Sequence, residues 1–251
     1  MQKTAKYINR FIKRPIKRSI QKVLHIPDPW QDIQRLTVNR KPGIIVDVGA
    51  NKGQTAVKLS ALLPEWKIYA FEPFPETFKK LEEVVSSLPN VIPFNIAISN
   101  KTGTADFHVN ASNVTNSLLP ATNSGMSYFP EELNLQGIIQ VCTKTLDDWS
   151  KEANIHDIRI LKMDVQGSEL LVLEGATELL LNSVQLVFSE VQFLPIYEDS
   201  ATFGRVEAFL LDRGFYLYQL YDLHSGPDGQ LLYGDALFIK KGDGSIFYRV
   251  N

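Results

Sequence analysis

The sequence has only one cysteine, Cys142, and no apolar run of the roughly 20 residues that a membrane-spanning helix needs. A lone thiol excludes an internal disulfide, which is typical of proteins in a reducing compartment. No set of His, Cys, Asp or Glu residues has the spacing of metal ligands. We therefore expect a cytoplasmic protein and assign no residue as a metal ligand.

Acidic residues are absent from residues 1–27, and basic residues are scarce in the rest of the chain. Eight of the 26 Lys and Arg residues lie in that first segment, so 18 remain against all 28 Asp and Glu residues. A nucleic-acid-binding protein needs a basic face. The acidic body of this chain therefore excludes nucleic acid as its expected partner.

The basic segment also carries an isoleucine at every fourth position, Ile8, Ile12, Ile16 and Ile20, interrupted by Pro15. This spacing predicts a basic N-terminal helical extension, residues 1–40, with apolar side chains on one flank. Four roles stay open for this extension: a solvated or docked helix, a targeting segment, a nucleic-acid contact, or a peripheral contact of residues 1–27 with the inner membrane surface.

From residue 43 onward, short β-rich runs alternate with helical patterns. Strands are expected at 43–49, 67–73, 90–99, 158–165 and 184–191, and helices include 168–182 and 203–212. Two further strand patterns flank a polar loop at 110–125, and the closing strand 234–241 is expected to pair antiparallel with 215–222 across the loop 223–233. The pattern predicts one α/β domain, residues 41–251, with a mostly parallel sheet covered on both faces.

Ligands of such sheets bind beyond the carboxyl ends of the strands. The first strand ends in "VDVGANKG", where Gly49 and Gly53 allow a tight turn into a helix whose free N–H groups suit a carboxylate or phosphate. The second strand ends at Glu72, where an acid can accept both hydroxyls of a ribose. The two features together predict a site for an adenosine-bearing ligand.

Two such ligands compete, NAD and S-adenosylmethionine. The loop does not read G-x-G-x-x-G, because Ala50 and Asn51 stand where the glycine that approaches a pyrophosphate is expected. Asp47 would repel a pyrophosphate, whereas it would attract the ammonium group of S-adenosylmethionine. The loop therefore favours S-adenosylmethionine as the cofactor.

Several blocks resemble the FkbM family of S-adenosylmethionine-dependent methyltransferases. They are "VDVGANKG", "FEPFPETF", "NIAIS", "NSLLP", "TLDDW", "ILKMDVQGSELLVLEGA" and "GDALF", spread over residues 43–241. The resemblance implies a class I methyltransferase fold, which is Rossmann-like, with a seven-stranded sheet and a small β insertion. It also implies methyl transfer to oxygen, often of a sugar.

Carried over residue by residue, the resemblance places the methionine part of the cofactor on the glycine loop and the ribose on Glu72. It places adenine near Phe74 and Ala97, and Asn95 is a further candidate because it lies at the end of the third strand. The predicted cofactor-binding residues are thus Asp47, Gly49, Ala50, Asn51, Gly53, Glu72, Phe74, Asn95, Ala97 and Asp164.

Methyl transfer to a hydroxyl calls for a base to receive its proton. Asp164, at the end of a strand, is the first candidate, and Lys162 lies on the same strand face with either Asp164 or the substrate as its expected partner. Glu190, at the end of the next strand, is a third catalytic candidate, as an acceptor-binding group. At Gln166 the family more often has Glu, and an amide cannot act as the base.

The leading interpretation is an O-methyltransferase that acts on a sugar, a glycan or a related small-molecule acceptor. Two alternatives stay open, an NAD- or nucleotide-sugar-dependent oxidoreductase and a catalytically idle binding module on the same fold. Nothing in the lid-like segment 110–136 or the loop 223–233 identifies the acceptor.

Overall fold

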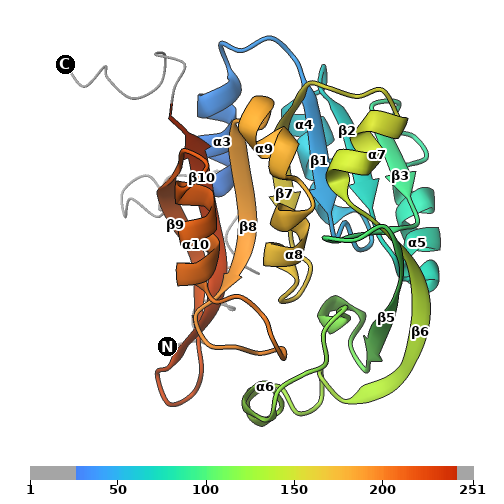
Figure 1. Cartoon of the computed structure of the whole chain (residues 1–251), viewed down its shortest axis with the longest axis vertical. Coiled ribbons are helices and arrows are strands. Elements are labelled where there is room, and N and C mark those ends of the chain that lie inside the picture. Colours follow the sequence, from blue (N-terminus) through green and yellow to red (C-terminus); the bar gives the residue numbers. More distant parts are fainter. Residues whose placement is uncertain (1–26, 242–251) are drawn as a thin grey trace, which may run out of the picture.

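Seven strands form one sheet in the order β3-β2-β1-β7-β8-β10-β9 (Figure 1). The structure is a computed structural model, and it describes residues 27–241. The strands are β1 (Ile44–Val48), β2 (Lys67–Phe71), β3 (Val91–Phe94), β7 (Ile158–Met163), β8 (Leu186–Gln192), β9 (Phe215–Ser225) and β10 (Leu231–Lys240).

All neighbouring strands of this sheet pair in parallel except β10, which pairs antiparallel with both β8 and β9. The chain begins in the middle at β1, runs outward to β3 and then returns to β7 on the other side of β1. The predicted sheet, with a closing strand antiparallel to its predecessor, is confirmed. The reversal between β1 and β7 marks the position where open α/β sheets bind ligands.

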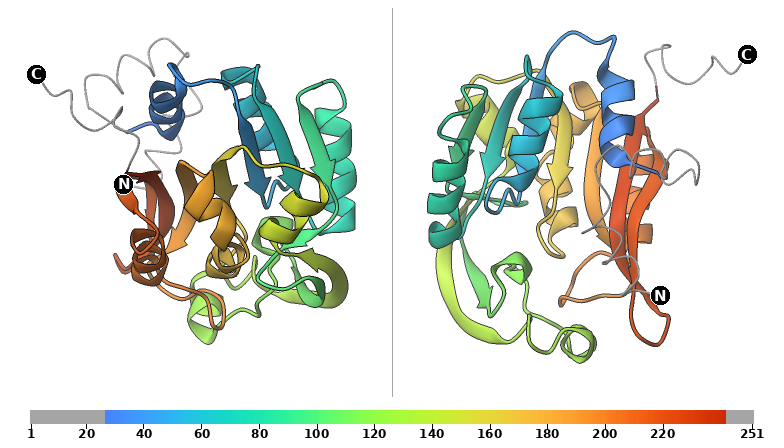
Figure 2. Two further views of the ribbon diagram at one scale, coloured as in Figure 1. Left: turned by 45° about the horizontal axis from the view of Figure 1, so that its top comes forward. Right: turned by 180° about the vertical axis from the view of Figure 1, so that it is seen from behind.

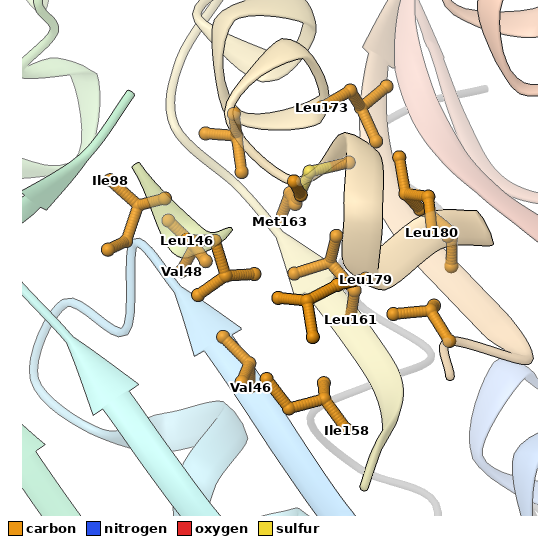
Figure 3. Close-up of a cluster of buried hydrophobic side chains, with 14 of the residues drawn as sticks. Val46, Val48, Ile98, Leu146, Ile158, Leu161, Met163, Leu173, Leu179 and Leu180 are labelled. Atoms are coloured by element: carbon orange, nitrogen blue, oxygen red, sulfur yellow. The ribbon is translucent and has the colours of Figure 1, made fainter. Parts of the chain in front are cut away.

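Helices cover both faces of the sheet, as the sequence predicts. One face carries α3 (Pro29–Thr37), α4 (Gln54–Leu62) and α5 (Pro75–Val85), and the other carries α7 (Leu146–Glu152), α8 (Glu169–Glu174), α9 (Thr177–Asn182) and α10 (Phe203–Leu211) (Figure 2). Successive residues of β1 point to opposite faces, so Ile45 packs in one core and Val46 in the other. Figure 3 shows Val46 and Val48 beside Leu161 and Met163 of β7.

Between β3 and β7 the chain leaves the main sheet and forms the predicted β insertion. Its sheet has the order β4-β6-β5, with β4 (Ala97–Ile98), β5 (Gly103–Asn110) and β6 (Leu135–Lys144). The short helices η1 (Asn113–Thr115) and α6 (Asn123–Tyr128) lie between β5 and β6, and in Figure 1 this insertion lies below the main sheet.

The insertion divides the expected strand 90–99 between two sheets, because β3 ends at Phe94 and β4 pairs with β6. Asn95 lies at the break, and its side-chain amide donates to the backbone oxygens of Glu72 and Pro73 at 2.8 and 3.0 Å. These two side-chain hydrogen bonds are formed at the point where the backbone hydrogen bonds between β2 and β3 end. Asn95 therefore fixes the loop after β2 from outside the cavity described below.

Two expected segments also differ in length. The helix predicted over 168–182 is two helices, since α8 ends before Gly175, where an added Cβ would lie 2.1 Å from the carbonyl oxygen of Ser99, the residue after β4. The loop predicted over 223–233 is shorter, since β9 continues to Ser225 and β10 begins at Leu231.

Helix α3 belongs to the segment predicted as a helical extension. Its first-turn N–H groups are capped by Asp28, and Ile33 and Leu36 pack in the same core as Ile45. The isoleucine pattern of residues 1–26 lies outside the described residues. Within residues 27–241, no helix combines the length and the apolar character needed to cross a bilayer.

Candidate active site

A cavity of about 260 Å³ lies where β1, β2 and β7 end. Its lining includes Val48, Phe71 and Asp164 at the strand ends, and the inserted segment contributes Asn113 and Asn116. The cavity thus occupies the reversal point of the sheet, between the main domain and the insertion.

The glycine loop after β1 forms one wall of the cavity. Gly49 has a φ of +73°, and the N–H groups of Gly49 and Ala50 donate to the carbonyl oxygen of Phe71 at 3.0 and 2.9 Å. An added Cβ on Gly49 would lie 1.9 Å from the carbonyl oxygen of Asp164. The sequence predicts a tight turn at this glycine. In the structure Gly49 also allows the backbone of the loop after β7 to come close.

Gly53, the second glycine of the loop, begins α4 in a left-handed conformation with a φ of +89°. An added Cβ there would lie 2.9 Å from a methyl group of Leu81, so this glycine also allows α4 to pack against α5. Gly53 lies outside the cavity lining, whereas Gln54 and Thr55 in the first turn of α4 belong to it. No side chain caps this turn, which leaves its N–H groups and the positive end of the helix for an anionic group.

Glu72 forms the wall opposite α4 and is only 6% exposed. One carboxylate oxygen accepts the N–H of Asn51 at 3.0 Å, and the other accepts the N–H of Phe74 at 2.9 Å. Burial raises the pKa of Glu72 to about 7, although these two bonds favour the charged form. Each oxygen keeps accepting capacity for a further donor, such as a ribose hydroxyl.

Asn116 supplies an unpaired donor in the same cavity. It is 8% exposed, its Oδ1 accepts the N–H of Asn110 at 2.8 Å, and its Nδ2 has no hydrogen-bond partner within residues 27–241. Buried polar groups without partners are uncommon, so this amide fits a polar ligand that completes the site. The cavity thus combines a helix start, a carboxylate that can bind ribose hydroxyls and a free amide. This combination suits an adenosine-bearing ligand that carries a carboxylate.

Lys162 pairs with Asp47, and not with Asp164 or the substrate as the sequence analysis expected. The two are direct register partners on β7 and β1, and their side chains are 8% and 0% exposed. The Nζ of Lys162 lies 3.0 Å from Oδ1 of Asp47 and donates to the carbonyl oxygen of Gly49 at 3.2 Å. Burial raises the pKa of Asp47, and the Lys162 ammonium opposes that rise. Asp47 lies outside the cavity lining. The ion pair therefore supports the glycine loop from within the sheet.

Gln166 joins two of the predicted catalytic carboxylates. Its side-chain N–H₂ donates to Oδ1 of Asp164 at 2.8 Å and to Oε1 of Glu190 at 2.9 Å, and its Oε1 accepts the hydroxyl of Tyr197 at 2.9 Å. Gln166 has a φ of +54°, and its own carbonyl oxygen accepts the hydroxyl of Ser117 at 2.7 Å. The amide is thereby fixed in the orientation that offers both its N–H bonds to carboxylates.

The surroundings of Glu190 disfavour negative charge. Burial raises the pKa of Glu190 well above its usual value, and the carboxylates of Asp164, Glu169 and Asp235 act in the same direction. Burial likewise raises the pKa of Asp235, the register partner of Glu190 on β10, to about 7. A carboxyl group with a pKa of about 7, as at Asp235, can exchange a proton near neutral pH.

The structure therefore divides the predicted site residues into two groups. The cavity lining includes Gly49, Ala50, Asn51, Glu72, Ala97, Lys162 and Asp164. Phe74 is instead buried against Phe107, with ring centroids 6.5 Å apart, and Glu190 reaches the cavity through Gln166. Sequence reasoning missed Gln54, Thr55, Asn113 and Asn116, since helix-start and insertion residues have no pattern of their own.

Comparison with known proteins decides the family. The model of the FkbM methyltransferase domain matches residues 47–217, which span β1 to β9 and contain every candidate site residue named above except Asp235. This chain belongs to the FkbM methyltransferase family. It is a methyltransferase with S-adenosylmethionine as its cofactor, and the oxidoreductase alternative is wrong.

Curated methyltransferases match most of the chain. The 2-O-methyltransferase NoeI of Sinorhizobium fredii is 29% identical over 190 residues, 73% of this chain and 71% of that protein. The hexuronic acid methyltransferase AglP of Haloferax volcanii is 28% identical over 179 residues, 69% of this chain and 68% of that protein. A solved FkbM methyltransferase from Methylobacillus flagellatus is 15% identical with a TM-score of 0.49, over 79% of this chain and 43% of that one.

Proposed function

We propose that this methyltransferase transfers the methyl group of S-adenosylmethionine to a hydroxyl of a sugar or glycan. The observation that carries the proposal is the pair of carboxylates, Asp164 and Glu190, held by one amide beside the cofactor cavity. A hydroxyl that is methylated loses its proton, and a carboxylate at this place can receive it. The printed names of NoeI and AglP, a 2-O-methyltransferase and a hexuronic acid methyltransferase, support the same class of acceptor.

The cofactor is held, in this proposal, by the walls of the cavity. Glu72 accepts the ribose hydroxyls, and the first turn of α4 with Gln54 and Thr55 binds the methionine carboxylate. Asn51 and Ala97 line the remaining wall, with Phe74 behind it. Asp47 acts indirectly, because its partner Lys162 donates to the carbonyl oxygen of Gly49 and so holds the loop.

The chain's own groups then position the acceptor. The bound cofactor supplies a methyl group on a sulfonium, which is already activated for transfer. Asp164 lines the cavity and receives the hydroxyl proton, while Glu190 binds a neighbouring hydroxyl of the acceptor. Gln166 keeps the two carboxylates in fixed positions, which is the kind of positioning that accelerates a two-substrate reaction.

Mass spectrometry of glycans and small metabolites from cells with and without the protein tests this function. A sugar that is one methyl group heavier only when the protein is present is the expected result, and the purified chain must reproduce it with S-adenosylmethionine. A catalytically idle module, the remaining alternative from the sequence, gives no methylated product in either assay. Methylation confined to proteins or nucleic acids would contradict the proposal.

We also propose that the enzyme works in the cytoplasm and contacts the inner membrane surface through residues 1–27. The support is their composition, eight basic residues and no acidic one, because each basic residue near an anionic surface contributes about 1 kcal/mol. Flotation of the full chain and of a chain lacking residues 1–27 with phosphatidylserine-containing liposomes tests this. Equal behaviour of the two chains would contradict the proposal.

A further inference from the structure

The acceptor side of the site is crowded with carboxyl groups from three adjacent strands. Asp164 follows the end of β7, Glu190 lies near the end of β8, and Asp235 faces Glu190 from β10 in direct register. Figure 1 shows β7, β8 and β10 side by side in the sheet. Burial raises the pKa of Tyr233, and the carboxylates of Glu190, Asp235 and Asp164 act in the same direction.

Positive charge is almost absent from this region. Lys162 is the only Lys or Arg among the described residues that line the cavity. Its ammonium is already bound to Asp47 and to the carbonyl oxygen of Gly49. The neighbouring charges that shift the pKa of Asp235 are the carboxylates of Asp164 and Asp222 and, in the opposite direction, Lys162 alone.

The neutral donors that adjoin Asp164 and Glu190 are already engaged. Both side-chain N–H bonds of Gln166 are directed at Asp164 and Glu190, so the amide has none left for an anionic substrate. The nearby hydroxyl of Tyr197 donates to Gln166, and that side chain is 1% exposed. The carboxylate of an anionic substrate would lie beside several carboxyl groups here. Lys162 is already paired, and the donors of Gln166 and Tyr197 are already used.

Building on the proposed sugar function, we propose that the acceptor is an uncharged sugar unit and that the site rejects uronic acids. Hydroxyl groups suit a site of this composition, because they donate hydrogen bonds to Asp164 and Glu190. A hexuronate carboxylate would add one more negative charge beside Asp164, Glu190 and Asp235, carboxyl groups that already repel one another's charge in a partly buried place, and this is unfavourable. In this respect the chain differs from what the name of its relative AglP implies for that protein, even though the two are 28% identical.

The identity of the methylated sugar tests the proposal. Hydrolysis of the methylated product from cells that contain the protein, followed by mass spectrometry, shows whether the methyl group is on a neutral sugar or on a uronic acid. The purified full chain is then assayed with S-adenosylmethionine and matched glycosides of glucose and glucuronic acid, galactose and galacturonic acid, and mannose and mannuronic acid. We expect the neutral member of an accepted pair to have a kcat/KM at least about 100-fold higher than its uronate.

Charge-removing variants separate electrostatic selection from shape. Glu190→Gln replaces an ionisable carboxyl group by a neutral amide of nearly the same shape and is expected to lower the preference for the neutral glycoside about tenfold, whatever it does to the rate. Asp235→Asn is the second variant, in case the first does not fold, and is expected to act in the same direction. Glu82→Gln, the same change at an exposed position of α5, is the matched control and must leave the ratio unchanged.

Each outcome has a separate meaning. A methylated uronic acid, or equal rates for both members of a pair, overturns the charge selection while the sugar methyltransferase function stands. An unchanged ratio in both charge variants also overturns it, because selection would then come from shape. No methylated sugar from cells or from the purified chain overturns the proposed function and this inference with it.

Discussion

Loss of Lys162 should destabilise the protein far more than loss of an equally close but exposed lysine. Lys162→Met removes the one cation, among the described residues, that pairs with Asp47, which is 0% exposed and whose two oxygens have no other hydrogen-bond partner in this part of the chain. Breaking a buried ion pair in this way costs about 3–5 kcal/mol, since it leaves an uncompensated buried charge. That is a large part of the 5–15 kcal/mol that stabilises a typical domain.

The chain offers a matched control in Lys151. It pairs with Glu178 at 2.8 Å, close to the 3.0 Å of the buried pair, but both side chains are more than half exposed. Surface pairs contribute about 0–1 kcal/mol, so Lys151→Met should cost no more than that. Urea unfolding followed by far-ultraviolet circular dichroism gives both free energies, provided that the slope with urea is unchanged.

Two further measurements show whether the unpaired buried charge of Asp47 causes the loss of stability in Lys162→Met. The double variant Asp47→Leu/Lys162→Met removes both charges and should be more stable than Lys162→Met alone, because apolar replacement of a buried pair is often nearly neutral. The cost of Lys162→Met should also shrink at acidic pH, where the buried Asp47 becomes protonated. If Lys162→Met costs no more than Lys151→Met, the ion pair does not support the glycine loop as we describe.

Three other predictions concern the same site. Glu72→Gln should weaken S-adenosylmethionine binding about 10- to 100-fold in calorimetry, because a charge-assisted hydrogen bond contributes about 1.5–3 kcal/mol; unchanged affinity would contradict its ribose role. Gly49→Ala should prevent stable folding because its Cβ would collide with the loop after β7, whereas Gly229→Ala, with a φ of +88° but open space around it, should cost only about 1–2 kcal/mol in urea unfolding. Burial raises the pKa of Glu169 from 4.5 to about 7, so the native state holds an extra proton between these values and the unfolding free energy should fall as pH rises through that window. Glu169→Gln should flatten this slope by up to about 1.4 kcal/mol per pH unit, and an unchanged slope would contradict it.

The architecture and the position of the site follow from local patterns in the sequence. Apolar runs such as residues 43–49 predict strands buried on both faces, and alternation with helices predicts the parallel sheet. The strand-end rule then selects Glu72 and Asp164, and both line the cavity. These inferences depend on period and chain order, which can be read without knowing any contact.

Contacts between segments distant in sequence could not be read in the same way. The partner of Lys162 depends on the register of β7 against β1, and a shift of one residue would have turned its side chain to the other face. The break at Gly175 depends on how closely β4 approaches that helix, and the unpaired amide of Asn116 depends on how the insertion folds over the cavity. No periodicity in the sequence encodes these distances.

Gln166 shows how an inference about one residue can be sound and still miss its role. The sequence analysis concluded that an amide cannot act as the base, and that statement stands. In the structure the amide has a positioning role. Its two N–H bonds join Asp164 to Glu190, which no carboxylate could do. With a carboxylate at this position, three acids would share one small space, and at least one would have to be protonated. The amide instead adds no third acid and holds Asp164, the proposed acceptor of the hydroxyl proton, close to Glu190, which can bind the next hydroxyl of the same sugar.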